Sequence, residues 1–132
     1  MEAIRENTTL DNRMLMADDE DALTFAFRNL FKTRKMAIDT CSSLETARTL
    51  IDQNNYKMVL TDLRLGNSLN SDGFKLTRYA KARNPESIVI LWTAHGTGDT
   101  KKNSFDAGAD FYFEKPLSPG HIKNIIKNLA TT

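Results

Sequence analysis

Short apolar runs and helical apolar stripes alternate along the whole chain. The runs are too short for globular helices, and they predict five buried β-strands. Between and after them, apolar residues recur at helical spacing and predict five α-helices. We expect strands at residues 14–17, 36–41, 58–62, 87–93 and 110–114, and helices near residues 22–31, 43–53, 74–82, 97–107 and 122–129.

Strict alternation of strands with helices predicts an α/β protein built on one parallel sheet. Right-handed crossovers place helices on both faces of such a sheet, which makes it doubly wound. The strand order does not follow from the sequence alone, although five-stranded chains with this rhythm often adopt the flavodoxin-like order 2-1-3-4-5. The 132 residues fit one domain. We expect a polar N-terminal lead over residues 1–12 and the domain over residues 13–132.

Several local patterns lead to more specific expectations. Ser42, followed by Glu45, matches a capping box at the start of the second helix. Phe25 belongs to a wide apolar face that we expect the first helix to bury. The loop after residue 62 is long and rich in Gly, Asn and Ser, so we expect it to be exposed and mobile. Phe105 is the only large apolar residue of the 97–107 helix, which predicts a weakly anchored, movable element.

Charge and cysteine content exclude several classes of protein. Eighteen basic and seventeen acidic residues give a formal net charge of +1, so no global field favours nucleic acid or a membrane surface. The single cysteine, Cys41, forms no internal disulfide, which suits a reducing compartment. No apolar run approaches membrane-spanning length. We therefore expect a cytoplasmic protein that binds neither nucleic acid nor membranes.

Residues that could take part in binding or catalysis lie at the ends of the predicted strands. Asp18 and Asp19 come after the first strand, Asp62 ends the third, Thr93 ends the fourth and Lys115 follows the fifth. Each has an ordinary explanation alone, such as a helix cap, a turn former or a solvated cation. In the order 2-1-3-4-5 they converge on one crevice, where three carboxylates repel unless a divalent cation neutralises them. Mg²⁺ suits such oxygen ligands, and a lysine with a hydroxyl suits a transferring phosphoryl group.

The segments that carry these residues resemble a known family. The sequences MLMADDE, VLTDLRL, VILWTAHG and GADFYFEKP resemble, in order, the motifs of the chemotaxis-regulator-like receiver domain of two-component response regulators. The resemblance extends over residues 13–129. It implies that Asp62 is the phosphoacceptor, supplied by a histidine kinase or a phosphotransfer protein. It also implies that Asp18, Asp19, Asp62 and the backbone carbonyl of Arg64 hold Mg²⁺.

The same resemblance implies a switch. Lys115 would pair with the carboxylate and then with the phosphoryl oxygens, and Thr93 would hydrogen-bond the phosphoryl group. Tyr112 matches the aromatic position whose rotamer follows that movement. The surface around the fourth and fifth helices would then change for partner binding or dimerisation, so the implied output is another domain or a downstream protein. Catalysis would be limited to the domain's own phosphorylation and dephosphorylation.

Departures from the family pattern leave alternatives open. The segment between Asp62 and Gly73 is longer than usual and lacks the family's proline, with Gly66 near that place. One alternative is a receiver-like docking module that works without phosphorylation. Another is a phosphohydrolase with Asp62 as nucleophile, although such enzymes typically carry an acid where Arg64 stands. Neither the cognate kinase nor the pathway follows from the sequence, and both a stand-alone receiver and part of a longer regulator remain open.

Overall fold

The protein is described here by a computed structural model. It describes residues 11–21, 24, 25, 28, 29, 36–65, 71–94, 96–116, 118, 120, 124 and 127. The apolar stripes of the first and last predicted helices lie mostly outside these residues. The two histidines of the chain, His95 and His121, lie outside them as well. Within the described residues, no helix is both long enough and apolar enough to cross a lipid bilayer.

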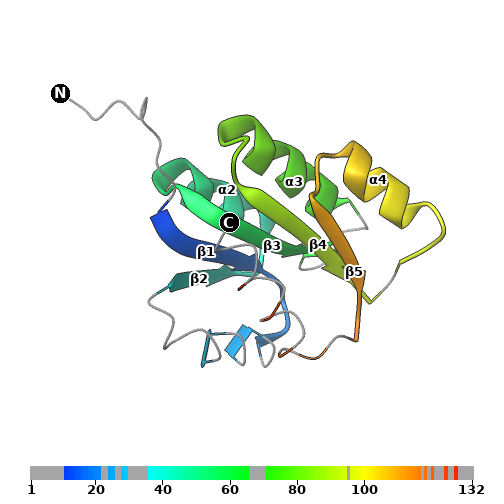
Figure 1. Ribbon diagram of the computed structural model, residues 1–132, viewed down its shortest axis with the longest axis horizontal. Helices are drawn as coiled ribbons and strands as arrows, with labels where there is room; N and C mark the ends of the chain where they lie inside the picture. The colour runs from blue at the N-terminus through cyan, green and yellow to red at the C-terminus, as the bar shows by residue number, and fades with distance from the viewer. Residues whose placement is uncertain are drawn as a thin grey trace.

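Five parallel strands form the sheet that organises the fold (Figure 1). Their order is β2-β1-β3-β4-β5, which confirms the predicted doubly wound topology and places the second strand at an edge. The first strand begins at residue 11, earlier than its apolar run. The strands are β1 (Asp11–Ala17), β2 (Ala37–Cys41), β3 (Tyr56–Asp62), β4 (Ile88–Thr93) and β5 (Phe111–Glu114).

Three helices lie along one face of this sheet (Figure 1). They are α2 (Leu44–Gln53), α3 (Asp72–Arg83) and α4 (Thr100–Asp106). The capping residue of α2 is Ser43, whose Oγ accepts a hydrogen bond from the backbone N–H of Thr46 at 3.2 Å. The prediction of Ser42 as the cap was therefore wrong by one residue. Asn54 and Asn84 are the C-caps of α2 and α3.

Alternate residues of the central strands point to opposite faces and build two apolar clusters. On the face that carries α2 and α3, Leu15, Val59 and Val89 pack with Ala47 and Leu76 of the helices. On the other face, three methionines pack with Leu60, Ile90 and Trp92, and all six side chains are almost fully buried. Both faces of β1, β3 and β4 are thus enclosed, as the continuous apolar runs predict.

The segment after β3 packs more tightly than we predicted. Leu63 and Leu65 are each only 2% exposed, so the start of this segment belongs to the core rather than to an exposed loop. α3 begins at Asp72, two residues before the predicted start, and therefore includes Gly73. The Gly73 backbone N–H donates to the carbonyl oxygen of Leu63 at 2.8 Å. The base of the segment is therefore closed by a backbone hydrogen bond.

Two aromatic residues that we assigned to apolar helix faces are exposed. Phe25 is 66% exposed, and Phe105 of α4 is 44% exposed. The buried residues of α4 are Thr100 and Ser104, and the Ser104 hydroxyl donates to the Thr100 carbonyl oxygen at 2.7 Å. α4 thus inserts no large apolar side chain into the core. This agrees with the prediction of a weakly anchored helix and strengthens it.

The close approach of α3 to β3 leads to a stability prediction. A Cβ atom at Gly73 would lie 2.5 Å from the carbonyl oxygen of Asp62 and 2.6 Å from the Cα of Leu63. We expect Gly73→Ala to lower the free energy of unfolding by about 1–3 kcal/mol in urea titrations, despite the higher helix propensity of alanine. Gly98→Ala is the matched control, since nothing lies within 4 Å of its added Cβ. Equal stability of the two variants would contradict the tight contact.

Candidate functional site

Three carboxylates gather at the carboxyl edge of the sheet. Asp18 and Asp19 follow β1, and Asp62 is the last residue of β3, the neighbouring strand. Each offers an oxygen, and these oxygens all lie within 4.8 Å of one another. Asp18 is 1% exposed and Asp62 is 7% exposed, whereas Asp19 is open to solvent. The site therefore has two buried acids and one acid at its mouth.

Backbone contacts fix the orientation of Asp18. Its backbone N–H donates to the carbonyl oxygen of Cys41 at 3.0 Å, which continues the pairing of β1 with β2. Its Oδ1 accepts the backbone N–H of Glu20 at 2.9 Å. Its Oδ2 accepts a hydrogen bond from Lys115 at 2.9 Å. Burial nevertheless raises the pKa of Asp18, because it outweighs these hydrogen bonds and the charge of Asp62 acts in the same direction.

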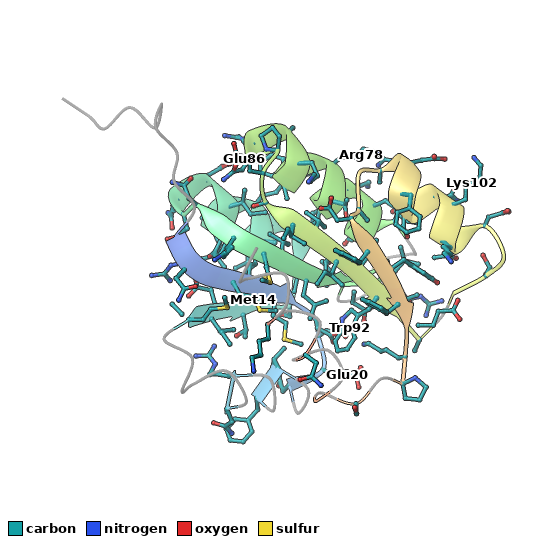
Figure 2. The ribbon with its side chains drawn as sticks, in the orientation of Figure 1. Met14, Glu20, Arg78, Glu86, Trp92 and Lys102 are labelled. Atoms are coloured by element: carbon teal, nitrogen blue, oxygen red, sulfur yellow. The ribbon has the colours of Figure 1, made fainter. Side chains whose placement is uncertain are left out.

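The Lys115 ammonium group connects the carboxylates. Its Nζ lies 2.9 Å from Asp18 Oδ2, 3.2 Å from Asp62 Oδ2 and 3.0 Å from Glu20 Oε1. It also lies 4.8 Å from the centre of the Trp92 ring, a cation–π contact. Figure 2 labels Trp92 and Glu20, which lie near each other at this end of the molecule. Burial lowers the pKa of Lys115, but the surrounding carboxylates outweigh it and hold that pKa above its ordinary value.

Backbone pairing places Thr93 beside Lys115. The Lys115 backbone N–H donates to the carbonyl oxygen of Thr93 at 2.9 Å, and Thr93 is fully buried at the end of β4. The backbone N–H of Arg64 lies 3.5 Å from Asp62 Oδ1, at the limit of a hydrogen bond. A cation and a backbone donor therefore lie next to the Asp62 carboxylate, and Thr93 ends the neighbouring strand.

Tyr112 lies on β5 close to this edge. Its hydroxyl donates to Glu114 Oε2 at 2.9 Å, and its ring packs against a small cluster that contains Leu63 and Leu91. Burial, followed by the bond to Glu114, raises the pKa of Tyr112 to about 12. A Cβ atom at Gly96 would overlap the Tyr112 hydroxyl, so glycine leaves room for this side chain. Tyr112 is thus held against Glu114 in this structure.

The donor set fits a small, hard divalent cation. Carboxylate oxygens are the ligands that Mg²⁺ prefers, and an exposed acid at the mouth leaves room for the waters that it retains. The acids outnumber the ammonium group, since Asp18, Glu20 and Asp62 contact Lys115 and Asp19 lies with Asp18 and Asp62. A cation would relieve this excess negative charge.

The structure brings together the residues that the sequence singled out. Asp18, Asp19, Asp62, Thr93 and Lys115 all lie at one edge, and their individual roles remain predictions. The sequence analysis missed the contacts of two further residues with the lysine. These residues are Glu20, which pairs with the ammonium group, and Trp92, whose ring lies against it. Their positions next to Asp19 and Thr93 are the only signal that the sequence offers for them.

The first prediction at the site concerns Lys115. Lys115→Met leaves buried carboxylates unpaired, so in EDTA we expect a loss of about 3 kcal/mol in the free energy of unfolding. The control is Lys102→Met on α4, whose ion pair with Asp106 is exposed and where we expect less than about 0.5 kcal/mol. Urea titration measures both. Similar losses in the two variants would show that the buried cluster does not depend on its cation.

A second prediction follows from the raised pKa of Asp18. In the folded protein this carboxyl holds its proton to a higher pH than the ordinary value of 3.8. Its ionisation therefore costs stability as the pH rises above 3.8 and through the raised pKa. In EDTA, we expect Asp18→Asn to gain stability over the wild type across this window and to keep the gain at neutral pH. A difference that stays constant with pH in urea titrations would contradict the shift.

Comparison with known proteins supplies the family. The family model of the response regulator receiver domain matches residues 14–127. The alginate biosynthesis transcriptional regulatory protein AlgB of Pseudomonas syringae pv. tomato is 32% identical over 123 residues, which cover 93% of this chain and 26% of that protein. The transcriptional regulatory protein SrrA of Staphylococcus aureus is 29% identical over 120 residues, covering 91% and 48%. The chain thus spans less than half the length of these relatives.

Solved structures agree with this match. The beryllofluoride-activated NtrC4 receiver domain dimer superposes with a TM-score of 0.79 at 27% identity, covering 90% of this chain and 96% of that one. A two-component response regulator from Clostridium difficile gives a TM-score of 0.82 at 18% identity, covering 92% and 97%, and shows the shared fold alone. The chain belongs to the response regulator receiver domain family of two-component signal transduction.

Proposed function

We propose that Asp62 accepts a phosphoryl group in a Mg²⁺-dependent reaction and that this modification switches the surface of the domain. The observation that carries the proposal is the cluster itself. Oxygens of Asp18, Asp19 and Asp62 lie within 4.8 Å of one another, and Lys115 contacts Asp18 and Asp62. Such a site offers a carboxylate nucleophile, ligands for a divalent cation and an ammonium group for developing phosphoryl charge.

The proposed donor is a phosphohistidine on a histidine kinase or a phosphotransfer protein. A carboxylate oxygen of Asp62 attacks phosphorus, an oxygen–phosphorus bond forms, and the nitrogen–phosphorus bond of the donor breaks. The electron pair of the broken bond returns to the imidazole. Lys115 stabilises the charge on the equatorial oxygens, because its ammonium group already lies 3.2 Å from Asp62 Oδ2.

The metal site would be formed by three side chains and one backbone group. Asp18, Asp19 and Asp62 would hold Mg²⁺ with the carbonyl oxygen of Arg64, directly or through water. When bound, the ion neutralises the charge of the acids and of the incoming phosphoryl group. The chain's own contribution is to fix the two buried acids through the backbone contacts of Asp18 and the bridge from Lys115.

The switch would use Thr93, Tyr112 and α4. The phosphoryl group adds charge and acceptor oxygens beside Thr93, and the β4–α4 segment is drawn toward them. α4 shifts at low cost because its buried residues are Thr100 and Ser104. Tyr112 would leave Glu114 as the space around it changes.

The partners follow from the proposed switch and from the relatives. AlgB and SrrA are transcriptional regulatory proteins that are much longer than the segment matched here. We therefore propose that this domain controls an output domain or a downstream protein through the surface around α4 and β5; the helix expected at residues 122–129 lies mostly outside the described residues. The NtrC4 receiver forms an activated dimer, so dimerisation is a second form that this output would take.

The test is intact mass after incubation with acetyl phosphate and Mg²⁺. We expect the wild type and the control Asp106→Asn to gain one phosphoryl group, and we expect Asp62→Asn to gain none. EDTA should abolish the gain. If the adduct is short-lived, beryllofluoride replaces acetyl phosphate and Trp92 fluorescence reports the change, because the Trp92 ring contacts Lys115 at 4.8 Å.

Other outcomes would distinguish the alternatives. No adduct and no fluorescence response to beryllofluoride would contradict the proposal and favour a docking module that works without phosphate. Turnover of an external phosphate ester, lost in Asp62→Asn, would instead indicate a phosphohydrolase.

A further inference from the structure

A second polar cluster lies on the outer surface of α2 and α3. The Tyr79 hydroxyl donates to Asp52 Oδ1 at 2.6 Å and accepts a hydrogen bond from Arg83 at 2.6 Å. The guanidinium groups of Arg48 and Arg83 lie 5.4 Å and 4.7 Å from the centre of the Tyr79 ring. The ring and its hydroxyl thus organise two arginines and one carboxylate from two helices. None of these residues belongs to the Asp62 site.

The cations on one side of this cluster form no ion pair with any described residue. Arg48, Lys75, Arg78 and Tyr79 line a surface hollow of about 300 Å³. Among the described residues, no ion pair engages Arg48, Lys75 or Arg78, whereas Arg83 is paired with Asp52 at 3.1 Å. The Nε of Arg48 is buried without a hydrogen-bond partner. Three positively charged side chains without ion pairs therefore line this hollow.

A smaller cavity of about 170 Å³ lies on the other side of the cluster. Asp52 and Arg83 line it together with Tyr56 and Asn84. The side-chain amide nitrogen of Asn84 is buried and has no hydrogen-bond partner. Unpaired donors thus occur on both sides of the Tyr79 cluster along the same seam between α2 and α3. Buried donors without partners are rare in native proteins.

The surrounding charges limit what would bind. Glu45 lies one helical turn before Arg48 on α2, and Asp72 lies one turn before Lys75 on α3. Residues three apart share one side of a helix, so carboxylates border the cations. A long polyanion running along the helices would meet these acids, whereas a short segment with a few carboxylates would not. The combination of Tyr with Arg is also typical of protein–protein interfaces rather than of phosphate-binding stripes.

We propose that the hollow between α2 and α3 is a docking site for a short acidic segment of a partner protein. Its carboxylates would pair with Arg48, Lys75 and Arg78, and Tyr79 would supply the flat contact surface at the centre. Charge complementarity carries the choice of partner, because Lys75 and Arg78 are exposed, Arg48 is half-buried, and none of the three forms an ion pair among the described residues.

This surface is separate from the proposed phosphorylation site. Figure 2 shows Arg78 on α3, well apart from Trp92 and Glu20 near the carboxylates. Binding at the hollow therefore needs no phosphoryl group. It would keep a partner close to the domain in both states of the Asp62 switch.

The experiment is fluorescence anisotropy with a labelled short peptide of alternating glutamate and glycine residues at low ionic strength. We expect saturable binding to the wild type. We expect the double variant Lys75→Glu with Arg78→Glu to bind the peptide at least about tenfold more weakly, since two charged contacts are reversed. Both residues are exposed, so circular dichroism should show an unchanged fold.

The matched control carries the same change of charge on another helix. Lys101→Glu with Lys102→Glu on α4 should retain wild-type affinity, as should Asp62→Asn. The proposal would be overturned by no saturable binding to the wild type, by an equal loss of affinity in the α4 control, or by tighter binding of a single-stranded oligonucleotide of equal charge. Loss of peptide binding in Asp62→Asn would also overturn it, because the hollow would then depend on the other site.

Discussion

The ammonium group of Lys115 is the constraint on which the functional edge of this domain depends. Two nearly buried carboxylates, Asp18 and Asp62, would repel each other across the carboxyl edge of the sheet, and this single cation is hydrogen-bonded to both. Its position is set by the backbone hydrogen bond to Thr93, by the contact with the Trp92 ring and by its place directly after β5. One ammonium group thus links the ends of β1, β3 and β5.

The sheet makes this arrangement rigid on one side and adjustable on the other. β1, β3 and β4 are enclosed by apolar clusters on both faces, so the acids at their ends have little freedom. α4 is held less firmly, because the side chains that it buries against the core are Thr100 and Ser104 rather than large apolar residues. In the proposed switch, a change of charge at this rigid edge would therefore be passed to α4, the element that is easiest to displace. The α2 and α3 seam, held by the Tyr79 cluster, lies outside that path.

The sequence predicts the parts of this structure that depend on local pattern. Apolar runs identified the strands, and strand ends identified Asp18, Asp62 and Lys115, because parallel topology gathers such ends at one edge. Details that depend on tertiary packing were not accessible. Two adjacent serines are equal candidates for one cap, and only the geometry of α2 selects Ser43. The sequence shows that Phe105 is the only large apolar residue of its helix, but it does not show that the fold leaves this side chain exposed.

The contact of Glu20 with Lys115 joins residues 95 positions apart and has no local signature. By contrast, the unusual length of the segment after Asp62 is visible in the sequence, and the structure explains why it is tolerated. The Gly73 N–H and the Leu63 carbonyl close this segment at its base, and Leu63 and Leu65 seal it from below. Closure entropy grows only slowly with length. The ends of the segment are thus fixed independently of what lies between them, which makes this position a natural insertion point where the sequence can diversify without moving Asp62.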